Sequence, residues 1–207
     1  MMKSLINYIT EALISKKSRI RNEITINTKD ELKEIIKTRI SELNNNPNLN
    51  GILDLSDLDI SQLTDLSYLF QGIDWNSKEK ILYIDVTGWD TTNVTSMKSL
   101  FFGCWNTQDI YGIEDFNITN VTEAHAMFYK CAKIKSLDLS KWKPIKLTNI
   151  SDMFIGCVSL KSLGNIEHWI NDFPINLSRI PNYYGAGMFK YCRKLKKPSW
   201  YKYLKKE

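Results

Sequence analysis

Apolar and aromatic residues recur along the middle of the chain in one repeated phrase. The phrase that runs from Trp89 to Cys104 returns from Phe116 to Cys131 and from Trp142 to Cys157, with the apolar positions in register. A degenerate earlier copy runs from Leu58 to Ile73, and a fifth copy opens at Trp169 and ends at Cys192. The repeated Phe recurs at steps of 31, 27, 26 and 35 residues. Self-similarity at a nearly fixed period predicts a solenoid in which each copy packs on its neighbours.

Each copy is predicted to be a strand followed by a short helix. A triplet with period two precedes the opening residue, and its middle residue is expected to face outward. These triplets are Leu53-Asp54-Leu55, Ile84-Asp85-Val86, Leu137-Asp138-Leu139 and, more loosely, Tyr111-Gly112-Ile113 and Gly164-Asn165-Ile166. The apolar residues after the opener fall at helical steps; in the second copy they are Val94, Met97, Leu100, Phe101 and Cys104. We therefore expect an α/β fold, a leucine-rich-repeat solenoid of about five strand-helix units.

The amino-terminal end of such a stack needs a cover, and residues 23–49 are predicted to supply it as a capping helix. Thr28 and Glu31 have the spacing of a capping box, which indicates a helix start. The apolar residues that follow have helical spacing and stop before Asn44-Asn45-Asn46-Pro47. They are Leu32, Ile35, Ile36, Ile40 and Leu43. The repeats themselves are assigned to residues 50–195.

Three further segments flank or interrupt the repeats. Residues 1–22 contain an amphipathic stretch that we interpret as a docking helix for a partner protein, with membrane-surface binding as the alternative. Its candidate contact residues are Leu5, Ile6, Ile9 and Leu13. The fifth copy is about eight residues longer than the others, which predicts an inserted loop at about residues 172–186. Residues 196–207 form a basic, aromatic tail.

The repeated phrase resembles the BspA-type leucine-rich repeats, whose hallmark is close to L-D-x-S-x-W-D-x-S-x-V-T-x-M-x-x-M-F-x-x-C. The resemblance covers roughly residues 50 to 195 and rests on several positions repeated in register. Such repeats occur in bacterial surface adhesins, mycoplasma lipoproteins, some protists and tailed phages of gut bacteria. The resemblance implies binding to other proteins and no catalysis.

The first residues suggest a setting for this binding. Lys3 to Leu13, followed by Thr28 to Leu32, resembles the leader that precedes these repeats in crAss-like phages. Asn7, Thr10 and Glu11 interrupt the apolar run that a signal peptide needs, so no export is expected. We therefore expect a structural or accessory component of a tailed-phage virion, assembled in the host cytoplasm, with a bacterial cell-surface adhesin of the BspA type as the alternative.

Charge is distributed unevenly along the 207 residues, although the net charge is only +5. Residues 50–130 hold 12 acidic against 4 basic side chains, whereas residues 190–207 hold 8 basic side chains against Glu207 alone. This asymmetry suggests that the two ends meet different partners. No stretch approaches the roughly 18 apolar residues of a membrane-spanning helix, so no span is expected.

The residues that most often carry chemistry do not form a recognisable site. Each of the four cysteines follows a repeated Phe by three residues, which favours small buried core residues over a metal site or disulfides. His125 and His168 occupy unrelated repeat positions. No nucleophile, base and orienting group can be nominated together. We expect a protein that is not an enzyme and has no catalytic residue, metal or cofactor.

Two sets of residues are candidates for binding. The first is the predicted outward face of the strands. We favour an ordinary solvated surface there; the alternatives are a protein-binding surface and a calcium ladder. Its residues are Asp54, Asp85, Asp138, Asn165, Glu114 and Glu167. The second set lies at the basic carboxy-terminal end. We favour a carboxy-terminal cap for this segment over a segment that binds nucleic acid. Its residues are Lys194, Lys196, Lys197, Trp200, Lys202 and Lys205.

Overall fold

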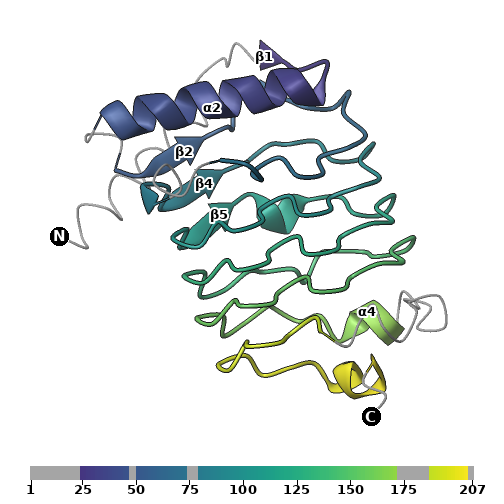
Figure 1. Ribbon diagram of the computed structural model, residues 1–207. Helices are drawn as coiled ribbons and strands as arrows, with labels where there is room; N and C mark the ends of the chain where they lie inside the picture. Colours follow the sequence, from purple (N-terminus) through teal and green to yellow (C-terminus); the bar gives the residue numbers. More distant parts are fainter. Residues whose placement is uncertain (1–23, 47–49, 74–78, 172–186, 205–207) are drawn as a thin grey trace.

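The computed structural model describes residues 24–46, 50–73, 79–171 and 187–204 (Figure 1). The predicted docking helix at 1–22, the inserted loop at 172–186 and Lys205 lie outside these residues. Successive copies of the repeat form turns that stack below a single long helix (Figure 1). The helices and strands are β1 (Ile24–Thr25), α2 (Lys29–Asn45), β2 (Ile52–Asp54), β3 (Leu58–Asp59), β4 (Tyr83–Asp85), β5 (Asp109–Tyr111), η2 (Ile113–Asp115), α4 (His168–Asn171) and η3 (Ser199–Leu204).

Helix α2 covers the amino-terminal end of the stack (Figure 1). The N–H of Glu31 donates to Thr28 Oγ1 at 3.1 Å, and the N–H of Asn27 donates to Glu31 Oε2 at 3.0 Å, so the capping box forms. The residues of α2 that face the first turn are buried: Leu32, Ile36, Ile40 and Leu43. In addition, β1 pairs in parallel with β3, which joins the segment before α2 to the first copy.

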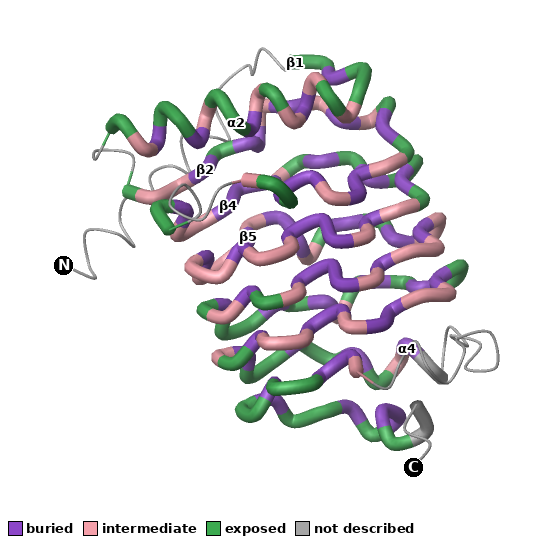
Figure 2. The backbone as a smooth tube through the Cα atoms, in the orientation of Figure 1, coloured by how far each residue is buried: buried purple, intermediate pink, exposed green. Residues whose placement is uncertain are grey.

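The strands before the openers form one parallel ladder. Strands β2, β4 and β5 lie side by side, with Leu53, Ile84 and Ile110 paired in register, and an isolated bridge between Ser136 and Ser162 extends the same arrangement. The middle residues of β2, β4 and β5, which are Leu53, Ile84 and Ile110, are buried, and Asp85 at the end of β4 is buried as well (Figure 2).

A second parallel ladder occupies the segments that were predicted as short helices. Asp65, Ser96, Glu123 and Asn149 are bridged in sequence from copy to copy. In residues 94–104 the structure contains turns and one bridge but no α-helix, so the predicted helix there is wrong. Some backbone N–H groups donate to the next copy, as from Met97 to the Glu123 carbonyl at 2.8 Å, and others donate to residue i−3, as from Leu100 to the Met97 carbonyl at 3.2 Å.

Positive φ angles explain why the apolar steps of three arise without a helix. Ser99 has a φ of 53° and Gly103 a φ of 69°, and the corresponding residues of the third copy, Ala126 and Lys130, have 53° and 58°. A left-handed residue ends a right-handed helix. Each segment is therefore a pair of tight turns that aims Met, Phe and Cys at the core.

The core consists of side-chain columns that run along the stack. Neighbouring rings of the repeated Phe lie 5.3 to 5.6 Å apart between centroids: Phe70, Phe101, Phe128, Phe154 and Phe189. Such aromatic pairs stabilise by about 0.5–1.5 kcal/mol each beyond the area that they bury. The four cysteines are free and buried, and the thiols of the last three donate to the Phe carbonyl of the preceding copy at 2.9 to 3.2 Å.

Candidate functional site

The outward side of the first ladder is the candidate site, and we call it the strand face. Strand pairing places Ile52, Tyr83 and Asp109 in one row across β2, β4 and β5. The same pairing places Asp54, Asp85 and Tyr111 in a second row. The strand face is thus defined by these six residues.

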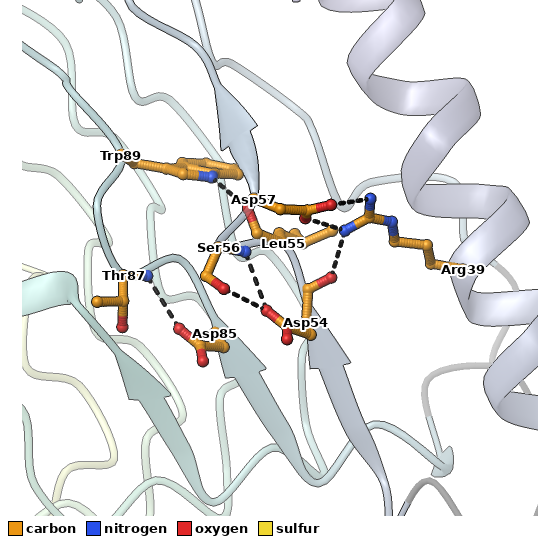
Figure 3. Close-up of polar contacts among 8 residues, drawn as sticks. All are labelled: Arg39, Asp54, Leu55, Ser56, Asp57, Asp85, Thr87 and Trp89. Carbon is orange, nitrogen blue, oxygen red and sulfur yellow. Dashed lines mark hydrogen bonds and ion pairs between the residues drawn. The ribbon is translucent and has the colours of Figure 1, made fainter. Parts of the chain in front are cut away.

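Asp54 and Asp85 lie at the ends of neighbouring strands and close turns there (Figure 3). Asp54 Oδ1 accepts hydrogen bonds from the N–H and hydroxyl of Ser56 at 3.0 and 2.6 Å, and Asp85 Oδ1 accepts from the N–H of Thr87 at 3.0 Å. A side-chain oxygen that binds the N–H two residues ahead is the Asx turn. Asp54 is exposed, whereas Asp85 is only 7% exposed, so Asp54 is the more available of the two to a partner.

Asp138 and Asn165 have the same turn-closing contact. Asp138 Oδ1 accepts from the N–H of Ser140 at 3.0 Å, and hydrogen bonds from the hydroxyl and N–H of Ser140 lower the pKa of this exposed carboxyl. Asn165 Oδ1 accepts from the N–H of Glu167 at 3.2 Å. The polar side chains that recur at the strand ends therefore have a structural role in ending each strand.

The outward row predicted for the third and fifth copies is shifted by one residue. Tyr111, and not Gly112, pairs with Asp85, because Gly112 is an extra residue with a φ of 87°. In the fifth copy Gly164 lies against Asp138, since a Cβ on Gly164 would meet Asp138 Oδ1 at 2.2 Å. Asn165 is therefore the residue after this row.

Glu114 and Glu167 lie beyond the strand ends and are not members of the strand face. Glu114 is half-buried in η2, and its neighbour Asp115 forms an ion pair with Lys141 at 2.6 Å. Glu167 accepts hydrogen bonds from the N–H and hydroxyl of Ser199 at 2.8 and 2.7 Å. Glu167 thus joins the fifth copy to the carboxy-terminal segment.

Two tyrosines that were not among the predicted site residues dominate the strand face. The rings of Tyr83 and Tyr111 are stacked with centroids 5.8 Å apart and planes 10° apart, and both residues are half-buried. Burial raises the pKa of Asp109, and burial together with the carboxylates of Asp109 and Asp85 raises the pKa of Tyr111 to about 12. The Tyr111 phenol is therefore neutral at neutral pH.

An arginine of α2 holds the edge of the strand face (Figure 3). Arg39 forms a two-pronged ion pair with Asp57, at 2.6 and 2.9 Å, and also donates to the Asp54 carbonyl oxygen at 2.7 Å. The hydrogen bonds that Arg39 donates to Asp57 raise the pKa of Arg39. These contacts fix α2 on the first turn.

The basic end is part of the stack. Trp200 is 2% exposed, its Nε1 donates to the Ile166 carbonyl at 3.0 Å, and its ring stacks on Trp169 at 6.3 Å. A buried indole cannot stack on a nucleic-acid base, so the predicted contact role of Trp200 is wrong. The lysines around it stay exposed, as predicted for a cap: Lys194, Lys196, Lys197 and Lys202.

The two histidines lie between neighbouring copies of the repeat. His125 Nδ1 lies 2.7 Å from Ser151 Oγ, and His168 Nε2 lies 3.1 Å from the Trp142 carbonyl oxygen, so both rings bridge neighbouring copies. Among residues 24–46, 50–73, 79–171 and 187–204, no group of three His, Cys, Asp or Glu side chains is arranged to hold a metal ion. Within the same residues, no helix has the length and apolar character to cross a membrane.

Comparison with known proteins identifies the family of the repeated region. No curated protein and no solved structure matches the chain. Residues 64–200 match the family described as "Mycoplasma protein of unknown function, DUF285". This match covers well over half of the chain and agrees with the BspA-like and mycoplasma repeat context of the repeated phrase. The chain therefore belongs to the DUF285 family.

Proposed function

We propose that the chain is a non-catalytic protein-protein interaction module, a leucine-rich-repeat solenoid whose strand face binds a partner protein. The observation that carries the proposal is the stacked pair of Tyr83 and Tyr111 on a parallel ladder. Tyrosine is enriched where proteins bind one another, because its ring gives large contact area and its hydroxyl a hydrogen bond. The rings already hold each other in place, so little side-chain entropy is lost on binding.

The surroundings of the tyrosines indicate the chemistry of the partner. Asp54 is exposed beside the pair and accepts hydrogen bonds from Ser56. Residues 50–130 carry 12 acidic and 4 basic side chains. A partner that places an apolar or aromatic side chain on the rings and Lys or Arg toward Asp54 fits this surface.

The biological setting is proposed from resemblance. The leader at Lys3 to Leu13 resembles that of crAss-like phages, which supports a structural or accessory role in a tailed-phage virion, with residues 1–22 docking the chain onto the particle. Membership of a family described from mycoplasma supports the alternative, a bacterial cell-surface adhesin. Mass spectrometry of purified virions separates them: a fixed copy number per particle supports the virion component, and absence from particles with detection on the bacterial surface supports the adhesin.

Site-specific photo-cross-linking tests the strand face. A photoreactive phenylalanine analogue at position 83 is expected to form one discrete adduct with the partner protein in an extract of the source cells or particles. The same analogue at position 143 is the control and should form no such adduct, because Lys143 is exposed but does not belong to the strand face. Identical adducts from both positions would contradict a specific strand face.

A further inference from the structure

The strand ladder stops abruptly at the fifth copy. In the fourth copy, the Lys135 carbonyl accepts from the N–H of Lys161 at 2.8 Å, and the N–H of Leu137 donates to the Ser162 carbonyl at 3.1 Å. The corresponding groups of the fifth copy are the Lys161 carbonyl and the Leu163 N–H. Neither of these makes a hydrogen bond to another described residue. Within the part of the chain that the structure describes, one acceptor and one donor, spaced as in the preceding rung, therefore have no partner at the edge of the ladder.

A hollow lies beside this edge, between the fifth copy and the carboxy-terminal segment. Its volume is about 340 Å³, and it is lined on one side by residues 161–167 and on the other by residues 196–198. Pockets that hold ligands start at roughly 300 Å³. The hollow is therefore large enough to admit a short stretch of extended chain beside Lys161, Ser162 and Leu163.

The charged side chains that line the hollow are basic, with the exception of Glu167. Lys135 and Lys161 lie on consecutive rungs, and Lys196 follows Cys192 by the same four residues by which Lys161 follows Cys157. Like charges on neighbouring strands are destabilising. Glu167, the acidic residue of the lining, already accepts two hydrogen bonds from Ser199. A row of exposed lysines next to open backbone groups therefore favours an anionic ligand.

We propose that the edge at Lys161–Leu163 binds an extended acidic peptide segment, which adds one more parallel rung to the ladder. The guest chain takes the place that Lys161 and Ser162 take against the fourth copy. The N–H of one guest residue donates to the Lys161 carbonyl, and the carbonyl of the next guest residue accepts from the Leu163 N–H. Glu or Asp side chains that flank these two residues reach Lys161, Lys196 and Lys197. This inference deepens the proposed function, on which it rests, by naming a second partner surface and its chemistry.

The geometry favours a peptide over other polyanions. The Lys161 carbonyl needs a donor, which a phosphodiester lacks, whereas every peptide residue except proline supplies one donor and one acceptor. Nucleic acid would also be expected to stack on aromatic side chains, but Trp200 and Tyr201 are 2% and 5% exposed and belong to the core. A free phosphate would satisfy the lysines and leave the Lys161 carbonyl without a partner.

Fluorescence anisotropy with a synthetic probe tests the proposal on the full chain. The probe is a labelled octapeptide of four Glu-Thr pairs, and its matched control carries an N-methyl group on every residue, which removes every backbone donor. We expect at least tenfold weaker binding of the methylated peptide, since one net hydrogen bond and its geometry are lost. Hydrogen exchange of the Leu163 amide should slow when the unmethylated probe is bound.

Two charge-reversed variants distinguish binding at this site from a general effect of the net charge of the protein. K161E/K196E is expected to weaken probe binding at least tenfold, whereas K37E/K143E, with the same change in net charge on exposed lysines elsewhere, leaves it within about twofold. Any of four results would overturn the proposal. The probe does not bind, the methylated peptide binds equally well, both variants lose binding equally, or inorganic phosphate or oligothymidine displaces the bound probe. Because the probe is synthetic, these outcomes are independent of whether the strand face binds its own partner.

Discussion

The indole Nε1 of Trp200 donates to the Ile166 carbonyl at 3.0 Å, which repeats the contact from Trp142 Nε1 to the Ile113 carbonyl at 2.9 Å. The carboxy-terminal segment is thus a partial sixth copy that covers the last Trp and Phe of the core. Stacked repeats need such covers because an open end exposes apolar side chains. The lysines of this segment lie on its outer side, where they remain in contact with water.

Removal of this cover should destabilise the whole stack. Trp200→Ala is expected to lower the free energy of unfolding by about 3–5 kcal/mol, because a fully buried aromatic side chain is lost. Trp200→Phe keeps a ring on Trp169 and is expected to cost less. Urea unfolding followed by circular dichroism measures both. A loss below about 1 kcal/mol for Trp200→Ala would mean that the segment is not part of the core.

The cysteines are predicted to be unreactive in the folded chain. All four are buried, and a hydrogen bond with the Cys192 thiol together with burial raises the pKa of Cys157 well above its usual range. The same hydrogen bond lowers the pKa of Cys192, but this thiol is only 3% exposed. Because the reagent must also reach the sulfur, iodoacetamide at neutral pH should modify none of the four in the native chain and all four after denaturation. Mass spectrometry counts the adducts. Rapid modification of Cys131 or Cys157 without unfolding would contradict the packing of the column.

Lys130 adopts a left-handed conformation with a φ of 58°, where three other copies have Gly72, Gly103 and Gly156. Lys130→Gly should therefore stabilise the chain by about 0.5–1 kcal/mol, because the side chain no longer strains the backbone. Lys133→Gly is the control, since Lys133 is also exposed but has no positive φ; it should lower the stability slightly. The midpoints of urea unfolding compare the two. A loss of stability in Lys130→Gly would show that the strain is absent.

The stability of the chain should fall at alkaline pH in a way that depends on Tyr111. Its pKa is raised to about 12 in the folded chain, against roughly 10 in an unfolded one. The unfolded state therefore loses its proton first, so the contribution is complete below about pH 10 and is lost as the pH rises toward 12. Tyr111→Phe should flatten the decline of the urea midpoint over this range. The same slope in the variant would contradict the burial of the phenol.

The repeat, its core columns and the capping helix could be predicted because they depend on patterns of residue type. Phe101, Phe128 and Phe154 recur with the same neighbours, and Thr28 and Glu31 have capping-box spacing. The second ladder could not be distinguished from a helix, because steps of three also arise from two turns with left-handed residues such as Ser99 and Gly103. Ser99 gives no local signal for such a conformation.

The candidate site was only partly predictable for a related reason. The inserted residue Gly112 shifts the third copy by one position, so Tyr111 rather than Gly112 faces outward beside Tyr83. An insertion of one residue inside a degenerate triplet has no signature in the period of the Phe residues. The pattern predicts Asp54, Asp85 and Asp138 as outward residues in the middle of a triplet. In the structure Asp54 and Asp85 are the last residues of their strands, and Asp85 is buried, so its outward position was predicted wrongly. The turn-closing hydrogen bonds of the three aspartates depend on backbone geometry that the pattern does not encode.

Binding of the cross-linked partner to variants of the strand face tests the central claim most directly. In an isothermal titration, Tyr83→Ala with Tyr111→Ala should weaken binding by about 30-fold or more, as expected when interface anchors worth about 2 kcal/mol are removed. Tyr191→Ala is the matched control, because Tyr191 is 52% exposed but lies in the fifth copy, away from β4 and β5. The account predicts a large loss for the double variant and none for the control; equal affinities for both variants and the unchanged chain would contradict it.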